Sequence, residues 1–188
     1  MRTKSLIRLV TAALFFAPTL GSFAQAQTNA THIPSAEIMT VYENLGDTID
    51  QQIRVVDIGD GINVAVGVLR RLETRTEGEE VNSIIHHRVT EVYYILSGSG
   101  ILVTGGVETD AAEFPADITA VRELIGPSGR RTVNNGQTQT VSPGDIVVIP
   151  TGVPHGFRHI QEQITYLSVR IDPDQVLPTG YAHPSLVE

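Results

Sequence analysis

Residues 144–155 read GDIVVIPTGVPH and combine a short apolar run, a tight turn and a histidine. Ile146–Ile149 consists only of β-branched residues, which favours an extended strand over a helix. Pro150 and Pro154 then end the strand, because proline has no N–H for a ladder and fixes the direction of a turn. We therefore expect His155 where the chain turns back into the next strand.

A second polar segment lies upstream, where residues 84–96 read IIHHRVTEVYYIL. If this is one uninterrupted strand, His87, Glu91 and Tyr93 share a face, because side chains alternate along a strand. A neutral imidazole beside a carboxylate supplies half of a site for a divalent metal. His86 points away from that face on a regular strand, and only a bulge would turn it inward.

The turn that ends at His155 resembles the second signature motif of the cupin superfamily, Gly-x5-Pro-x-Gly-x2-His-x3-Asn. Gly144, Pro150, Gly152 and His155 match this motif, and His159 stands where the motif has Asn. Glycine and proline are residues that a tight turn uses, so the match agrees with the turn expected here.

The upstream segment resembles the first cupin motif, His-x-His-x(3,4)-Glu-x6-Gly. His87, Glu91 and Gly98 match it, whereas Ile85 stands in the place of the first histidine. The two motifs occur in the order of the family, and the resemblance covers about residues 50–172. It implies an all-β, single-domain cupin jelly-roll barrel with a short N-terminal arm and a metal site inside the barrel.

Two ligand sets follow from this resemblance. In the first, His87, Glu91 and His155 form a 2-His-1-carboxylate site, which needs no irregularity in the strand. In the second, His86 is turned inward and completes a set of four ligands. The divalent metal expected there is Fe(II) or Mn(II), with Zn(II) or Ni(II) as alternatives, and a cupin that has lost its metal is a further alternative.

Other side chains near these ligands are candidates for the chemistry. Tyr93 would follow Glu91 on the inner face, either as a catalytic hydrogen-bond donor or as an aromatic that fills the barrel. Arg88, Arg158 and His159 are candidates for substrate binding, because they lie close in sequence to the ligands. An arginine can hold a carboxylate through two parallel hydrogen bonds.

The rest of the sequence alternates short β-branched runs with turn residues, which is typical of a sandwich or a closed barrel. Asp60-Gly61 and Asn135-Gly136 are hairpin signals, because a type I′ turn needs a positive φ at both central residues. Arg130 and Arg131 are interpreted as a charged strand edge. The expected strands are residues 52–58, 62–72, 84–85, 91–96, 101–104, 131–133, 137–141, 145–149 and 164–171.

The barrel is expected to contain an insertion at Gly105–Gly129, which would form a lid over the barrel mouth or a surface loop. Within the insertion, Ala112–Leu124 has a weak helical pattern. The expected parts of the chain are a signal peptide at residues 1–26, an N-terminal arm at 27–50, the cupin barrel at 51–172 and a C-terminal tail at 173–188.

Residues 1–26 have the three-part anatomy of a secretory signal peptide. A basic start precedes the apolar run Leu9–Ala17, and Ala24-Gln25-Ala26 is a small-x-small cleavage site. The apolar run is shorter than the ~20 residues that a membrane-spanning helix needs. We therefore expect cleavage and a periplasmic or secreted protein with no membrane contact afterwards.

The composition excludes several classes of protein. Hydrophobic residues make up 41% of the 188 residues and charged residues 18%, which is too apolar for a disordered chain. The formal net charge of −8 argues against a nucleic-acid partner. The chain has no cysteine, and its only lysine is Lys4, so a mature form offers neither a thiolate nor a Schiff-base amine.

Together these features predict a metal-dependent enzyme that acts on a small organic substrate inside the barrel. A dioxygenase is favoured, because a 2-His-1-carboxylate site leaves positions open for substrate and O₂. Isomerase or lyase chemistry is a second enzymatic possibility, since the fold does not choose among reactions. The alternative from a different class is a non-catalytic cupin that binds a small ligand or a metal outside the cytoplasm. The resemblance also implies a homodimer.

Overall fold

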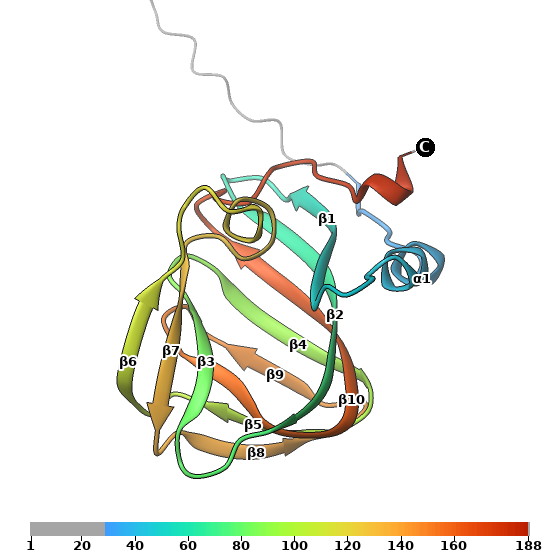
Figure 1. Cartoon of the computed structure of the whole chain (residues 1–188). Coiled ribbons are helices and arrows are strands. Elements are labelled where there is room, and N and C mark those ends of the chain that lie inside the picture. Colours follow the sequence, from blue (N-terminus) through green and yellow to red (C-terminus); the bar gives the residue numbers. More distant parts are fainter. Residues whose placement is uncertain (1–28, 188) are drawn as a thin grey trace, which may run out of the picture.

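A computed structural model describes residues 29–187, so the predicted signal peptide lies outside the described residues. In this part of the chain the strands form one antiparallel sheet that curls into a jelly-roll barrel (Figure 1), and the predicted all-β class is confirmed. The elements are α1 (Ser35–Glu43), β1 (Asp50–Asp57), β2 (Asn63–Arg75), β3 (Val81–His86), β4 (Thr90–Ser97), β5 (Gly100–Thr104), β6 (Val107–Glu113), β7 (Ser128–Asn134), β8 (Gln137–Val141), β9 (Ile146–Ile149) and β10 (His155–Asp172).

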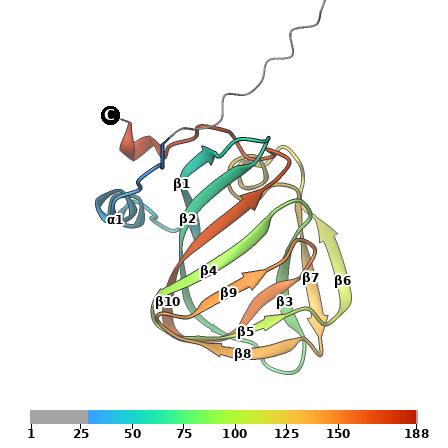
Figure 2. The same cartoon turned by 180° about the vertical axis from the view of Figure 1, so that it is seen from behind.

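The long strand β10 organises the barrel, because it pairs with four other strands. Its first residues pair with β5 and, at His155, with β3. From Thr165 onward it lies between β2 and β4. Its register against β2 shifts between Ile160 and Gln163, where the strand passes from one half of the barrel to the other. Seen from behind, β9 extends the sheet beyond β4, and β8 extends it beyond β5 (Figure 2).

Alternate residues of β4 and β10 fill the interior of the barrel. Tyr93, Ile95 and Tyr166 belong to one cluster of buried apolar side chains, in which each fully buried side chain contributes roughly 1.5–3 kcal/mol to stability. The same alternation buries Glu91 on β4 and Arg170 on β10. The strands that build the core therefore also bring polar groups into the interior.

One of the two predicted hairpins is confirmed. β1 and β2 pair around Asp60 and Gly61, both of which have positive φ, as a type I′ turn requires. At the second signal only Asn135 has positive φ, and the strands on either side do not pair with each other. β7 pairs with β3 and β6, whereas β8 pairs with β5, so the prediction of a hairpin at Asn135-Gly136 is wrong.

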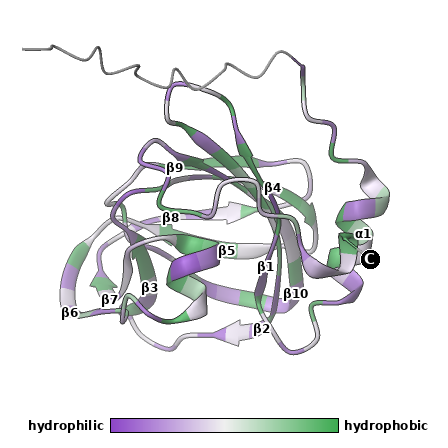
Figure 3. Cartoon of the chain, turned by 90° about the horizontal axis from the view of Figure 1, so that it is seen from above, coloured by the Kyte–Doolittle hydropathy of each residue, from purple (hydrophilic) through white to green (hydrophobic). Residues whose placement is uncertain are grey.

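The residues before β1 and after β10 pack against the barrel. α1 places Val41 against Ile53 of β1 and Val68 of β2 on the outer face of the sheet. After β10, Leu177 is fully buried and packs with Val55. The view from above shows α1 and the C-terminal end close together outside the barrel (Figure 3). The described residues include no helix suited to span a lipid bilayer.

The insertion at Gly105–Gly129 contains regular secondary structure and is therefore not a plain surface loop. It contributes β6, whose residues are all exposed, and a short π-helical turn, Ala120–Ile125. Because β6 pairs with β7, Arg130 and Arg131 lie on an internal strand, and the predicted strand edge is wrong. The π-helical turn packs near β1, at one end of the barrel.

Candidate metal centre

β3 ends at His86, and the chain bends before β4 begins. The bend interrupts the alternation of side chains, so His86 and Glu91 both point into the barrel although five positions separate them. His87 points outward, with its Nε2 atom 2.6 Å from Oε2 of Glu113. The expectation that His87 shares the inner face with Glu91 is therefore wrong, because the segment is not one continuous strand. His86 takes the inner position.

His86, Glu91 and His155 form a buried cluster. The side chains of the two histidines are 3% and 2% exposed, and that of Glu91 is 2% exposed. The Nε2 atoms of both histidines lie 3.1 Å from Oε2 of Glu91, and the three candidate ligand atoms all lie within 4.8 Å of one another. His155 opens β10 directly after the proline turn, which confirms its predicted position in the chain.

Each imidazole is hydrogen-bonded through Nδ1, the ring nitrogen on the side away from Glu91. Nδ1 of His155 lies 3.0 Å from the carbonyl oxygen of Val153, which can only accept, so Nδ1 carries the proton. Nδ1 of His86 lies 2.8 Å from Oγ of Ser128, whose own proton is donated to the carbonyl of Gly126 at 2.9 Å. In the neutral form of each ring Nδ1 is therefore the donor, and Nε2 presents a lone pair to the cluster.

The carboxyl of Glu91 is ionised in this environment. Burial by itself would raise its pKa, but polar contacts and charges around the carboxyl, among them the guanidinium of Arg170, outweigh burial and hold the pKa well below the usual range. Its Oε1 atom accepts hydrogen bonds from Oγ of Ser168 at 2.8 Å and from Nε of Arg170 at 3.0 Å. Burial lowers the pKa of His86, so this imidazole is neutral.

Arg170 connects the cluster to β1. Besides Glu91, its guanidinium donates to Oε1 of Gln52 at 2.7 Å and to Oδ2 of Asp50 at 2.5 Å. Arg170 is 1% exposed, and two carboxylates compensate its buried charge. This arrangement helps to orient the carboxylate of Glu91, because the guanidinium that donates to its Oε1 atom is itself held by Gln52 and Asp50.

The donor atoms of the cluster fit a divalent metal. The Tyr93 hydroxyl donates to Oε2 of Glu91 at 2.9 Å, whereas a neutral imidazole that donates from Nδ1 has no proton on the nitrogen that faces this oxygen. Nε2 of His155 is buried and makes no hydrogen bond, although it lies 3.1 Å from Glu91. Lone pairs brought this close repel each other unless a cation lies among them. Two neutral imidazoles and one carboxylate are a ligand set that first-row divalent metals take.

Tyr93 both fills the barrel and contacts the cluster. Its ring lies 4.5 Å from that of Tyr166 and 5.9 Å from that of His155, measured between centroids. Burial raises the pKa of the Tyr93 phenol well above its usual range, so the hydroxyl keeps its proton and remains a donor to Glu91. A catalytic role of this hydroxyl stays a prediction.

A cavity of about 270 Å³ reaches His155 from the gap between the end of β2 and the start of β3. Ile84, Phe157 and Ile160 provide apolar walls. The volume lies just below the roughly 300–1,000 Å³ typical of pockets for drug-sized ligands, so the cavity suits a small molecule.

The three predicted substrate-binding residues lie elsewhere. Arg88 is exposed and pairs with Asp174, with 2.7 Å between Nε and Oδ2. Arg158 donates to the carbonyl oxygen of Glu79 at 3.1 Å, and His159 lies beside a register shift between β10 and β5. None of the three lines the cavity that reaches His155, so the structure does not support their predicted role.

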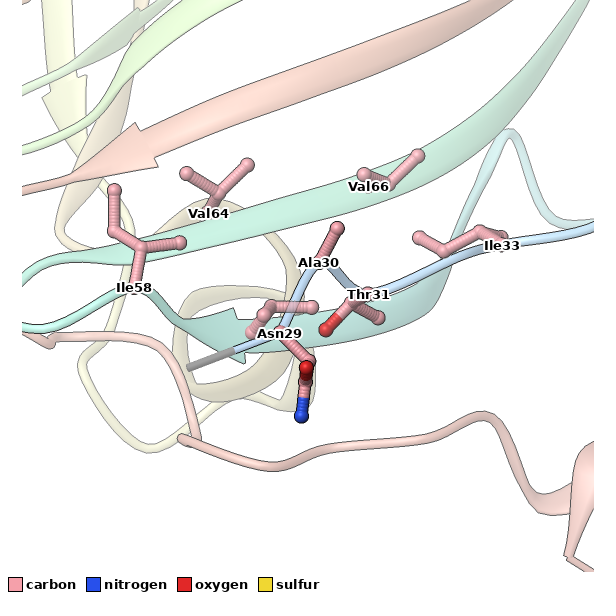
Figure 4. A pocket seen from close by; sticks show the side chains of 8 residues that line it. Asn29, Ala30, Thr31, Ile33, Ile58, Val64 and Val66 are labelled. Atoms are coloured by element: carbon pink, nitrogen blue, oxygen red, sulfur yellow. The ribbon is translucent and has the colours of Figure 1, made fainter. Parts of the chain in front are cut away.

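A larger hollow of about 490 Å³ lies outside the barrel, between the N-terminal residues and β2 (Figure 4). Ala30, Ile33, Val64 and Val66 contribute apolar side chains to it, and no titratable residue lines it. It therefore offers no group for acid–base or metal chemistry, in contrast to the cavity at His155.

Sequence reasoning missed the residues that support the cluster. Ser128, Ser168 and Arg170 lie outside both motifs. The sequence signal for two of them was that Ser168 and Arg170 alternate along the otherwise apolar end of β10, where a strand would turn both side chains inward.

The first motif also allows four residues between its second histidine and Glu91. With that spacing His86 is the second histidine, and Ile84 stands in the place of the first.

The fold and the buried cluster agree with a comparison against protein families. The family model described as Cupin matches residues 68–183, and the chain therefore belongs to the cupin family. A search of the curated proteins found no match.

Solved structures with a similar fold share little sequence with this chain. They include BH2720 from Bacillus halodurans, with a TM-score of 0.44, 15% identity and coverage of 84% of this chain and 92% of that one. The DMSP lyase DddQ from Ruegeria pomeroyi DSS-3 has a TM-score of 0.37, 17% identity and coverage of 65% and 46%. A predicted oxalate decarboxylase from Thermotoga maritima has a TM-score of 0.34, 16% identity and coverage of 65% and 92%.

Proposed function

We propose that this cupin is a metal-dependent enzyme that oxidises a small organic substrate with O₂. In this proposal His86, Glu91 and His155 hold one divalent ion, Fe(II) or Mn(II). The observation that carries it is the convergence of two imidazole nitrogens, Nε2 of His86 and Nε2 of His155, on one buried carboxylate oxygen at 3.1 Å. When bound, an ion with a 2-His-1-carboxylate set supplies open positions for substrate and O₂.

The chain's own residues would orient and protect this site. Val153 and Ser128 hold the two imidazoles in the tautomer that ligation needs. Arg170 orients the carboxylate of Glu91, and Tyr93 holds a proton at Oε2 of the same carboxylate. Because the candidate ligands are buried, with side chains 2–3% exposed, little bulk water would reach them.

Elemental analysis of protein purified without a His-tag tests the metal site. We expect near-stoichiometric metal in the wild type and its loss in His86→Ala and His155→Ala. His87→Ala is the matched control, because the neighbouring His87 contacts Glu113 outside the cluster and its removal should leave the metal in place. A wild type that stays empty after reconstitution with Fe(II), Mn(II), Zn(II) and Ni(II) would refute the proposal.

A second experiment separates the enzyme from a non-catalytic binding module. The second candidate is favoured by Ile84, which leaves three ligands where the motif has four. Oxygen consumption by the iron- or manganese-loaded protein is measured against aromatic and keto-acid compounds. Uptake that requires both metal and substrate supports the dioxygenase. Substrate turnover without uptake of O₂ would indicate an isomerase or lyase, and metal binding without any turnover would indicate the binding module.

We also propose that the protein acts in the periplasm or outside the cell, as a homodimer. The three-part anatomy of residues 1–26 supports export. Tyr94, Ile146 and Val148 support self-association, because these apolar side chains are exposed next to one another on β4 and β9. Cell fractionation tests the first statement, and sedimentation of wild type beside Ile146→Lys tests the second.

A further inference from the structure

The cavity that reaches His155 is lined by basic residues and by no acidic residue. It contains two arginines, Arg71 and Arg130, and no aspartate or glutamate. The chain as a whole carries a formal charge of −8, so this is a locally basic cavity on an acidic protein. Neither arginine belongs to the two cupin motifs.

Arg71 reaches the cavity from β2. Its Nε donates to the hydroxyl of Tyr166 at 2.8 Å, and its terminal nitrogens make no hydrogen bond to any described residue. A phenol is a neutral partner, so no carboxylate neutralises this guanidinium through a direct ion pair. The hydrogen bond to Tyr166 orients the Arg71 side chain through Nε and leaves its two terminal nitrogens available to donate to a ligand.

Arg130 lines the same cavity from β7. On β7 it is paired in register with Ile84 of β3, which also lines the cavity. The side chain of Arg130 makes no hydrogen bond or ion pair with the described residues. Its neighbour Arg131 points to the other face and is paired with both Glu108 and Glu113. Alternation along β7 therefore sends one arginine to acidic partners and the other to the cavity.

We propose that Arg71 and Arg130 bind the anionic group of the substrate, and that this substrate is a small organic carboxylate with an apolar body. A guanidinium without an acidic partner matches a carboxylate through parallel hydrogen bonds. Phe157 and Ile84 provide the apolar surface for the remainder of the molecule. The inference names the substrate class of the proposed enzyme and rests on that function, but anion binding can be measured without turnover.

The test uses pairs of ligands that differ in charge and hardly in size. Propionate, succinate and benzoate are each titrated into ¹⁵N-labelled protein beside propionamide, succinamide and benzamide. Dissociation constants come from the amide chemical shifts at low ionic strength, with the protein both metal-loaded and dialysed against a chelator. We expect at least one carboxylate to bind about tenfold or more tightly than its amide.

Substitutions connect this preference to the two arginines. Arg71→Gln and Arg130→Gln should each weaken binding of the preferred carboxylate about tenfold or more and leave binding of its amide unchanged. Arg130→Lys should restore part of the preference, because it keeps the charge without the planar fork. Arg122→Gln is the control, because Arg122 is exposed on the π-helical turn and does not line the cavity. Arg130 is exposed, so its variants are expected to fold.

Two results would overturn the inference. One is a wild type that binds no carboxylate more tightly than its amide, and the other is a preference for carboxylate that survives in both glutamine variants. These two results differ from the result expected if only the proposed enzymatic function is wrong. If the protein binds no metal but shows the arginine-dependent preference, the anion site stands and the enzyme proposal fails.

Discussion

Nε of Arg170 donates to Oε1 of Glu91 over 3.0 Å, and both side chains are almost completely buried. The pair joins β10 to β4 inside the barrel, and Asp50 supplies the second carboxylate to the same guanidinium. Three charged groups thus lie in a region where an unpaired charge is costly. The carboxylate that completes the candidate metal site depends on this arginine for its charge and orientation.

Arg170→Met should therefore destabilise the protein strongly. The substitution leaves Glu91 and Asp50 without their cation, and breaking a buried pair on one side costs about 3–5 kcal/mol. Urea unfolding of metal-free protein measures the free energy of unfolding. Arg88→Met is the control, because it removes an exposed ion pair with Asp174 and should have little effect. Equal unfolding curves for the two variants would contradict this account.

Ser128→Ala should weaken metal binding without unfolding the protein. The serine hydroxyl accepts the Nδ1 proton of His86, and loss of such an outer partner typically costs about 10–100-fold in metal affinity. Competition with a chelator of known affinity measures the effect. Ser83→Ala is a matched control, because Ser83 is also buried but bonds only to the carbonyl of Val81 on its own strand. The two variants should show the same metal affinity if Ser128 has no such role.

The position of His155 could be predicted because the signal is local. Two prolines and a glycine determine the turn wherever the strand lies, and His155 opens β10 as expected. The inward position of His86 could not be predicted in this way. The bend after β3 is stabilised by a hydrogen bond from the Gly152 amide to the His86 carbonyl and one from the His87 amide to the Pro127 carbonyl. Both partners lie at least 40 residues away in the sequence.

The failed hairpin at Asn135-Gly136 has a similar cause. The dipeptide is a good local turn signal, but the strands on either side find long-range partners on different parts of the sheet. Arg170 illustrates the opposite case, in which the sequence itself carries a signal for a buried charge. It alternates with Ser168 and Tyr166 along an apolar strand, and a charged residue at an inward position calls for a buried partner.

Metal-free protein should lose stability as the pH falls below about 6.5. Burial lowers the pKa of His86 in the folded state, whereas the unfolded histidine titrates near 6.5. Below this pH the unfolded state takes up a proton that the folded state does not, so unfolding is favoured until the folded pKa is reached. Glu91, whose folded pKa is well below 4.5, adds a further loss at pH values under 4.5.

Urea unfolding in the presence of a chelator, at pH 8, 7, 6 and 5, measures this dependence. His86→Gln should show a smaller loss between pH 6.5 and 5, because the group that titrates has been removed. Some dependence should remain, because burial also lowers the pKa of His183. A wild type and a His86→Gln variant with the same slope would show that His86 is not the group responsible.

Gly98→Ala should destabilise the β4–β5 connection more than a glycine substitution at an open position. Gly98 has a φ of 73°, and a Cβ atom there would lie 1.9 Å from the carbonyl oxygen of Gln163, where β10 changes register. Gly78 has a φ of 87° and no atom within 4 Å of such a Cβ, so Gly78→Ala measures the backbone cost alone. The clash should add roughly 1–3 kcal/mol, which lowers the Tm of Gly98→Ala by at least about 2 °C more. Equal Tm values would mean that β10 moves away at no cost, and that the last glycine of the first motif serves only the turn.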